Sequence, residues 1–285
     1  MTVQPTADPA QASRDLAEHG LALLTGALDI EAVREVRARL ETAIGVSEAD
    51  GVPTRGYPFD VDTHNQRVFH LFNLDPIFVD LIQRPLALRF VEQCLGATFL
   101  ISNFSANITA PGSARMQLHA DQGYVLPPWP SAPLACNIGW LLDDFTVENG
   151  GTCYVPDSHL RGHSPAADEV VATVAITAPA GSLMIMDGRL WHQTGDNRSQ
   201  DTRRAALFGY YVRPWLRPQV NWNAALWPQT VAQLAPDFLD RLGYYNGNVG
   251  RQIPNGRRAP VHRPDSLTDA ADHVFALGPG AAADA

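Results

Sequence analysis

The chain reads ATFLISNFSANITA at 97–110, ARMQLHAD at 114–121, LACNIGWLLDD at 134–144, GTCYVPDS at 151–158, VVATVAITA at 170–178, GSLMIMDG at 181–188 and RRAALFGYYVRP at 203–214. These short runs are rich in β-branched and aromatic residues, and Gly, Pro and Asp separate them. Such spacing is typical of an all-β sandwich or barrel. No helix-length pattern lies between the runs, so a parallel α/β sheet is not expected.

Outward from this core, the sequence before residue 97 predicts helices. Asp29 is expected to cap a helix whose apolar residues recur at the 3–4 spacing of one buried face. Residues 46–70 are rich in Gly, Asp and Thr and are expected to form a long loop, of the kind that covers a binding site. Asp75-Pro76 marks the start of another helix, which Pro85 ends. The sequence therefore predicts a helical N-terminal layer on a β-core.

The remaining segments complete a single domain over residues 1–285, with the β-core at about 97–213. Residues 1–12 are small and polar and are expected to be disordered. The segment after Pro214 is rich in Trp and Pro and predicts one short helix near 230–242. The tail from about 268 to 285 is also expected to be disordered.

Composition excludes several classes of protein. All 21 basic residues are arginine, so a lysine Schiff base and a P-loop lysine are both excluded. The net charge of −9 and the absence of a basic run argue against nucleic-acid binding. No run approaches ~18 apolar residues, so no membrane association is expected. The N-terminus resembles no secretory signal, which favours a cytoplasmic location. The oligomeric state stays open.

Three residues in the core pattern have the chemistry of a metal site. His119 and Asp121 are two apart in a strand run, so their side chains are expected on one face. Taken alone, this pair is equally compatible with a surface histidine beside a solvated aspartate. His192 follows another apolar strand, and two histidines with one carboxylate form a facial triad that holds Fe(II).

An arginine eleven residues after His192 fits the same chemistry. Activation of O₂ by Fe(II) needs an electron source, which a 2-oxo acid supplies. The far carboxylate of that acid must be anchored, and an arginine does so with two parallel hydrogen bonds. Arg203 opens the strand after His192, so we expect it to face the site, whereas Arg204 is expected to face away.

The runs HADQGY at 119–124, ENGGT at 148–152, VPDSH at 155–159 and WHQTGDNRSQDTRR at 191–204 resemble the phytanoyl-CoA dioxygenase family. The resemblance covers roughly residues 15–215. It implies a double-stranded β-helix (jelly-roll, cupin-like) fold and an Fe(II)- and 2-oxoglutarate-dependent dioxygenase that consumes O₂. It also implies His119, Asp121 and His192 as iron ligands and Arg203 as the 2-oxoglutarate anchor, with further 2-oxoglutarate contacts from Gln117 and Thr152. Family halogenases lack the carboxylate ligand, so the intact Asp121 argues against halogenation.

Several flanking residues have two interpretations each. Asn137 either points toward the cofactor, where its amide would bond a carboxylate, or is a core residue with its own partners. Tyr124 is near enough to the HxD pair to line a pocket. Trp129, in LPPWP, either walls the pocket or belongs to a rigid surface turn.

We expect a small, mostly apolar metabolite as substrate, bound between residues 46–74 and the segment after Pro214. Aromatic groups in these segments would line the pocket, and the alternative is that they attach the segments to the sheet. The candidate residues are Phe72, His70, Trp215 and Trp222.

The expected reaction is hydroxylation, desaturation or cyclisation at a C–H bond, in bacterial natural-product tailoring. An acyl-CoA hydroxylase of the same family is the nearest alternative. From other classes, a zinc-type hydrolase or lyase and a non-catalytic 2-oxoglutarate-binding module stay open.

Overall fold

The computed structural model describes residues 2–244. Its helices, in chain order, are α1 (Pro9–His19), α2 (Ile30–Ala49), α3 (Leu71–Leu74), α4 (Pro76–Ile82), α5 (Pro85–Leu95), the 3₁₀ turns η1 (Asp121–Tyr124) and η2 (Ser158–Leu160), α6 (Trp222–Ala225), α7 (Pro228–Gln233) and α8 (Pro236–Arg241). Its strands are β1 (Leu21–Leu24), β2 (Asn65–Val68), β3 (Leu100–Thr109), β4 (His119–Ala120), β5 (Ala135–Leu141), β6 (Thr152–Tyr154), β7 (Val174–Ala175), β8 (Leu183–Asp187), β9 (Trp191–Thr194) and β10 (Arg204–Val212).

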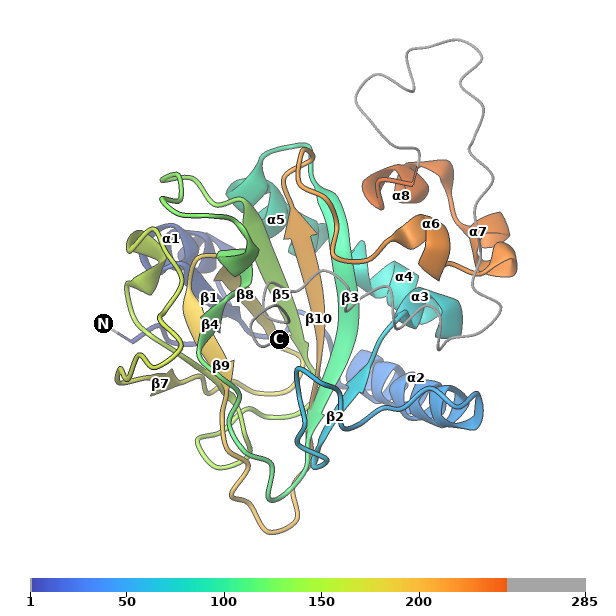
Figure 1. Cartoon of the computed structure of the whole chain (residues 1–285), viewed down its shortest axis with the longest axis horizontal. Coiled ribbons are helices and arrows are strands. Elements are labelled where there is room, and N and C mark those ends of the chain that lie inside the picture. Colours follow the sequence, from blue (N-terminus) through green and yellow to red (C-terminus); the bar gives the residue numbers. More distant parts are fainter. Residues whose placement is uncertain (1, 245–285) are drawn as a thin grey trace, which may run out of the picture.

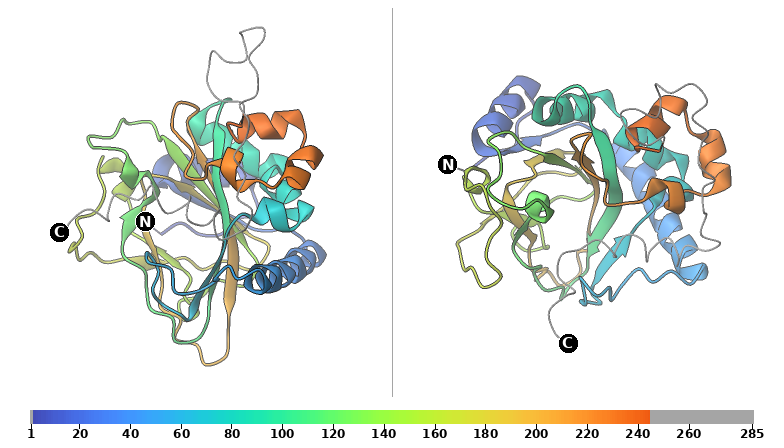
Figure 2. Two further views of the ribbon diagram at one scale, coloured as in Figure 1. Left: turned by 45° about the vertical axis from the view of Figure 1, so that its right-hand side comes forward. Right: turned by 45° about the horizontal axis from the view of Figure 1, so that its top comes forward.

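Two antiparallel sheets form the core, as the strand runs predict. The larger sheet has six strands in the order β1-β8-β5-β10-β3-β2, and the smaller has four in the order β4-β9-β6-β7. The small sheet lies on one side of the large one, and the α-helices lie on the other (Figures 1 and 2). This is the expected β-core with a helical layer.

Alternating residues of β10 show how the large sheet separates two environments. Ala205, Leu207 and Tyr211 pack in the main apolar cluster with the helices. Ala206 and Phe208 instead pack with residues between the two sheets. Successive strand residues point to opposite faces, so even-numbered positions of β10 face the interior of the barrel.

The helix caps fall where the sequence predicts them. The carboxylate of Asp29 accepts a hydrogen bond from the main-chain N–H of Ala32 at 2.8 Å at the start of α2. Asp75 accepts from the N–H of Ile77 at 2.9 Å at the start of α4. These bonds satisfy donors that the first turn of a helix leaves open.

The N-terminal residues do not match their expected disorder. Thr6 bridges Leu24 in parallel, and α1 begins at Pro9, with Asp8 as its cap. Two main-chain hydrogen bonds of 2.9 Å hold Thr6 along β1, one to Leu23 and one from Thr25 just after the strand, because β1 is an edge strand with unpaired groups.

Other boundaries also shift. The long loop expected at 46–70 contains β2, and β1 and β2 extend the large sheet beyond the expected core of 97–213. The single helix expected near 230–242 is two short helices, α7 and α8, because Pro236 starts a new one. The tail 268–285 lies outside the described residues. Within residues 2–244, no helix has the length and apolar character needed to cross a bilayer.

Candidate metal centre

His119, Asp121 and His192 converge between the two sheets. His119 on β4 lies directly opposite His192 on β9, and their ring centroids are 4.4 Å apart. The Nε2 atoms of His119 and His192 lie 3.9 and 3.8 Å from Oδ1 of Asp121. One ligand atom from each residue falls within 4.8 Å of the other two. Two imidazoles and one carboxylate in this arrangement fit a facial iron site.

Main-chain carbonyls fix the orientation of both imidazoles. Nδ1 of His119 lies 2.9 Å from the carbonyl oxygen of Gln117, and Nδ1 of His192 lies 2.9 Å from that of Leu190. A carbonyl only accepts, so each Nδ1 carries the proton and each Nε2 turns a lone pair toward Asp121. This is how metal-binding histidines are usually held.

The neighbourhood also keeps one imidazole neutral. Desolvation, together with the adjacent imidazole of His192, lowers the pKa of His119 well below its usual value. Only a neutral imidazole offers a lone pair to a metal. The His119 imidazole is therefore available to a metal at neutral pH.

Asn137 and Tyr210 hold Asp121 in place. The Asn137 amide donates a hydrogen bond of 2.8 Å to Oδ2 of Asp121, which leaves Oδ1 toward the histidines. The Tyr210 hydroxyl donates to the main-chain carbonyl of Asp121, also at 2.8 Å. One interpretation of the sequence had the Asn137 amide bond a carboxylate of the cofactor. In the structure it bonds the carboxylate of Asp121 instead. Tyr210 has no signal in the sequence apart from its inward position on β10.

The two arginines at the start of β10 point in the opposite sense to the expected one. The Arg203 side chain is 42% exposed and contacts Glu41 of α2 and Gln66 of β2, on the helical side of the sheet. Arg204 is fully buried, and its guanidinium lies 4.6 Å from the ring centroid of Phe145 in the inter-sheet core. We expected Arg203 to face the site and Arg204 to face away, and the structure shows the reverse. β10 begins at Arg204, and Arg203 precedes the strand.

The surroundings of Arg204 leave part of its guanidinium unused. Its Nη1 donates to Oδ1 of Asn107 at 3.0 Å, and its Nη2 donates to the carbonyl of Gly150. Its Nε is buried, with no hydrogen-bond partner among the described residues. Burial, with the nearby Arg67 cation, lowers the pKa of Arg204 to about 9. An anionic ligand here would relieve both the missing bond and the buried charge.

Gln117 and Thr152 differ in how the structure places them. The Gln117 side chain is exposed, and only its carbonyl touches the site. Met116 is turned inward instead, with its sulfur near Thr194 and Arg67. Thr152 is buried on β6 directly opposite Thr194.

Arg67 of β2 is a further neighbour of the site. It lies directly opposite Asn107 on β3 and pairs with Asp60 at 2.9 Å. Its charge acts on both His119 and Arg204. The alternation along β2 was hidden from sequence inspection because β2 lies in a segment expected to be a loop.

Two of the expected substrate residues lie on the wrong side of the large sheet. Phe72 and Trp222 are buried in the apolar cluster that joins the helices to the sheet, and their rings are 5.0 Å apart. The Trp222 indole donates to the carbonyl of Ile101 at 2.8 Å. These aromatics attach α3 and α6 to the sheet and do not face the triad.

The other four expected substrate residues lie in different surroundings. Trp129 is buried against Ala120 and Trp191, which follow His119 and precede His192 in the sequence and point to the opposite face of the small sheet. Trp129 therefore covers the outside of that sheet. His70 is buried at the start of α3 with a left-handed backbone. Trp215 is 65% exposed after β10. Tyr124 ends η1, three residues after Asp121, and is close to Tyr210.

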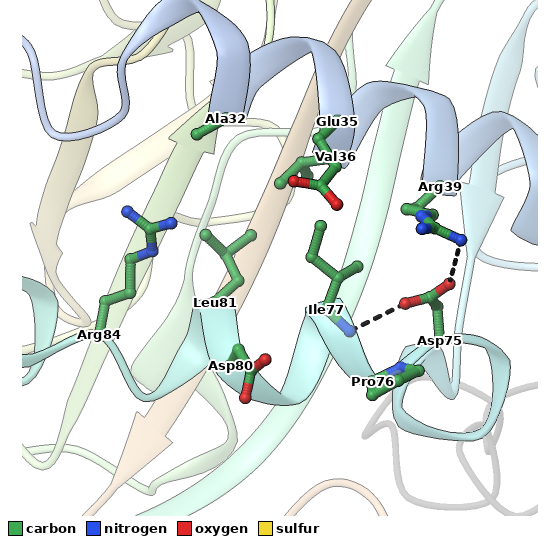
Figure 3. Close-up of a pocket in the computed structure, with 10 residues that line it drawn as sticks. All are labelled: Ala32, Glu35, Val36, Arg39, Asp75, Pro76, Ile77, Asp80, Leu81 and Arg84. Carbon is green, nitrogen blue, oxygen red and sulfur yellow. Dashed lines mark hydrogen bonds and ion pairs between the residues drawn. The ribbon is translucent and has the colours of Figure 1, made fainter.

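A hollow of about 370 Å³ opens elsewhere, between α2 and α4. Figure 3 shows its charged rim, where Arg39 pairs with Asp75 at 3.5 Å. All its lining residues come from positions 32–39 and 75–84, whereas the triad comes from β4, η1 and β9. The hollow is therefore separate from the metal centre.

A family model described as phytanoyl-CoA dioxygenase (PhyH) matches residues 16–205. Dioxygenase af480 of Aspergillus fumigatus is 38% identical over 241 residues, which cover 82% of this chain and 78% of that protein. Dioxygenase andF of Emericella variicolor is 27% identical over 253 residues, covering 84% and 86%.

Two solved structures share the fold at low sequence identity. The non-heme alpha ketoglutarate dependent epimerase SnoN from nogalamycin biosynthesis is 21% identical, with a TM-score of 0.59 over 72% of this chain and 82% of that chain. HygX from Streptomyces hygroscopicus, with nickel and 2-oxoglutarate bound, is 15% identical, with a TM-score of 0.57 over 73% and 88%. These matches confirm the double-stranded β-helix architecture.

Proposed function

The chain belongs to the phytanoyl-CoA dioxygenase family, and from this premise we propose that His119, Asp121 and His192 hold its iron while it oxidises a C–H bond of a small, mostly apolar metabolite. The enzyme is a non-haem Fe(II)- and 2-oxoglutarate-dependent dioxygenase. When bound, the iron with 2-oxoglutarate and O₂ supplies the oxidising chemistry. The observation that carries the ligand assignment is the convergence of one carboxylate and two Nε2 atoms whose partner nitrogens are already bonded.

Arg204, rather than Arg203, anchors the C5 carboxylate of 2-oxoglutarate. Arg204 faces the interior and has a buried Nε without a partner, whereas Arg203 lies outside the sheet. A guanidinium held by Asn107 and Gly150 is already oriented before the cosubstrate arrives, so little side-chain entropy is lost on binding. Arg67 adds a second positive charge on the same face, and Thr152 contributes a hydroxyl from the facing sheet.

The protein residues around the iron act by position and charge. The carbonyls of Gln117 and Leu190 keep each Nε2 unprotonated, and Asn137 prevents Asp121 from rotating its Oδ1 away from the histidines. The His119 side chain stays 40% exposed, which leaves the centre accessible from one side. Substrate approaches through this side, while the sheets exclude water from the other.

The substrate occupies the mouth beside His119. A cluster of Tyr57, Phe59 and Phe69, with ring centroids 5.4 to 6.2 Å apart, lies in the segment that carries Arg67. On the sheet itself, Ser105 and Phe208 face the interior and keep partial exposure. Aromatic walls with few polar groups suit an apolar metabolite. We place the reaction, a hydroxylation, desaturation or cyclisation, in natural-product tailoring, which the small molecules named with SnoN and HygX also support.

An anaerobic titration tests this proposal. Apoprotein given Fe(II) and 2-oxoglutarate should develop the weak visible charge-transfer band of the chelate, and admission of O₂ should then yield succinate. Alanine at His119, Asp121 or His192 should remove the band and the succinate while the circular dichroism spectrum stays unchanged. Succinate formation by any of these variants would refute the ligand assignment.

A further inference from the structure

A row of three side chains crosses the inner face of the large sheet at the level of the metal centre. Tyr210 of β10 lies directly opposite Asn137 of β5 on one side and Asn103 of β3 on the other. Residues paired in this way project from the same face. Figure 1 shows the three strands side by side. Asn137 and Tyr210 both bond Asp121, whereas the side chain of Asn103 bonds Gln219 instead.

The neighbours of Asn103 confirm that its side chain faces inward. Phe104, the next residue, packs on the helical side against Phe72. The pairing of β3 with β10 shifts next to Asn103, where Ser102 is the extra residue of a bulge. Bulges re-aim side chains beside functional sites.

The bulge also brings a second amide to Asn103. Oγ of Ser102 accepts a hydrogen bond of 2.8 Å from the N–H of Gln219, and the carbonyl of Ser102 accepts from the N–H of Val220 at 3.0 Å. These bonds hold the segment after β10 along the edge of β3. As a result, the Gln219 side-chain carbonyl lies 3.2 Å from Nδ2 of Asn103 and accepts a hydrogen bond from it.

The amide pair keeps unused hydrogen-bonding capacity. Oδ1 of Asn103 is buried, with no partner among the described residues. A side-chain amide offers one acceptor oxygen and two donor hydrogens, so a single bond between two amides always leaves a free oxygen on one and a free NH₂ on the other. This holds whichever way the two amides are turned. A buried acceptor without a partner is costly, and a ligand that supplies a donor removes that cost.

We propose that Asn103 and Gln219 together bind a hydroxyl group of the substrate, which donates to one amide and accepts from the other. A hydroxyl is the small group that does both at one atom. Neighbouring strands are about 4.8 Å apart, so Asn103 lies roughly 10 Å across the sheet from Asn137. The hydroxyl therefore lies away from the oxidised carbon and sets which C–H bond faces the iron. This inference rests on the proposed function and names a feature of its substrate class.

The test uses polycyclic terpenoids and aromatic polyketides supplied as pairs that differ by one hydroxyl group. Each compound is added to wild-type enzyme, and substrate-stimulated succinate formation is measured at several concentrations. The most stimulating hydroxylated compound should have a KM about tenfold or more below that of its deoxy partner, because a polar site rejects an analogue that leaves it unpaired. N103L and Q219L should each lose that preference by raising the KM of the hydroxylated member alone. Q83L removes an amide that bonds the carbonyl of Val79 at the end of α4, on the helical side of the large sheet. It is the matched control and should keep the preference.

The outcomes separate this inference from the proposed function. Absence of a hydroxyl preference in wild type, or an equal preference in N103L and wild type, overturns the inference even when succinate forms. If wild type forms no succinate from 2-oxoglutarate, the proposed function fails and the inference fails with it. The anaerobic chelate band of N103L and Q219L shows that the variants are folded and load 2-oxoglutarate.

Discussion

The two arginines at the start of β10 are adjacent in the sequence, but their side chains lie in different surroundings. Arg204 is buried between the sheets, whereas Arg203 pairs with Glu41 at 3.5 Å on the outside. An exposed pair of this kind contributes little to stability. Replacing each arginine separately therefore shows which of the two binds 2-oxoglutarate.

Arg204→Gln should raise the dissociation constant for 2-oxoglutarate by about 30- to 1000-fold, because a charge-assisted, two-pronged contact is worth about 2–4 kcal/mol. Arg203→Gln should change it by less than about threefold. The anaerobic visible band, titrated with 2-oxoglutarate, measures both constants. A large effect in Arg203→Gln with none in Arg204→Gln would return the anchor to Arg203.

The hydrogen bond from Asn137 to Asp121 is expected to strengthen iron binding. Asn137→Leu keeps the shape of the side chain but releases Oδ2 of Asp121, so iron affinity should fall by about 10- to 100-fold. Competition with a chromogenic chelator gives that affinity. Ser105→Ala, on the same face but without contact to Asp121 in the described hydrogen bonds, serves as the control. Unchanged affinity in Asn137→Leu would mean that Asp121 is held without the amide.

At the scale of elements, the close packing of α1 against η2 depends on a glycine at the end of α1. Gly20 ends α1 at φ +67°, and a Cβ there would lie 2.7 Å from the ring of the buried His159. Gly26 has nearly the same φ, +69°, but nothing lies within 4 Å of its Cβ position. Substitutions at Gly20 and Gly26 therefore allow the cost of backbone strain to be separated from the cost of steric overlap.

Gly26→Ala should lower the free energy of unfolding by about 1 kcal/mol, the cost of a left-handed backbone for alanine. Gly20→Ala should lower it by about 1–3 kcal/mol more, because the methyl group also meets His159. Urea denaturation followed by tryptophan fluorescence measures both. Equal losses would show that η2 moves freely away from α1.

The elements also show how far the sequence predicts this structure. Helix caps at Asp29 and Asp75 and the strand runs are local signals, and they place α2, α4 and most of the two sheets correctly. The triad was predictable because the i, i+2 spacing of His119 and Asp121 is itself geometric. The direction of the Arg204 side chain was not predictable in the same way. A shift of one residue in where β10 starts reverses which side chains point inward.

Residues that only tertiary contacts bring together were also missed. Tyr210 reaches Asp121 across 89 positions of sequence, and no local pattern marks it. Phe72 and Trp222 were assigned to the pocket because aromatic residues suit both a pocket and a core. Which face of the sheet they cover depends on the path of the chain between elements, and composition does not specify that path.

At the scale of the whole molecule, the N-terminal segment links the two sheets. Thr6 bonds β1 of the large sheet, and the N–H of Val3 donates to the hydroxyl of Tyr154 on β6 of the small sheet at 3.3 Å. Tyr154 lies directly opposite His192. The first residues thus brace the sheet that carries His119 and His192, two of the proposed iron ligands.

Deletion of residues 2–7 should lower the melting temperature by about 2–12 °C. Its two main-chain bonds to β1 are worth about 1–3 kcal/mol together, and each kcal/mol shifts the midpoint of a domain of this size by about 2–4 °C. Differential scanning calorimetry provides the measurement. The side chain of Gln4 bonds the carbonyl of Thr2 within the same terminal segment, so Gln4→Ala should have the melting temperature of the wild type. An unshifted midpoint in the deletion would mean that the bridge at Thr6 carries no stability.

The iron centre joins all these parts, and one experiment tests it most directly. Wild-type, His192→Ala and Arg204→Gln proteins are each mixed anaerobically with Fe(II) and increasing 2-oxoglutarate, and the visible charge-transfer band is recorded before O₂ is admitted and succinate is counted. We predict a saturable band and succinate from wild type, neither from His192→Ala, and a band that needs about 30- to 1000-fold more 2-oxoglutarate from Arg204→Gln. A band of wild-type strength in His192→Ala, or none in wild type, would contradict the assignment of this site.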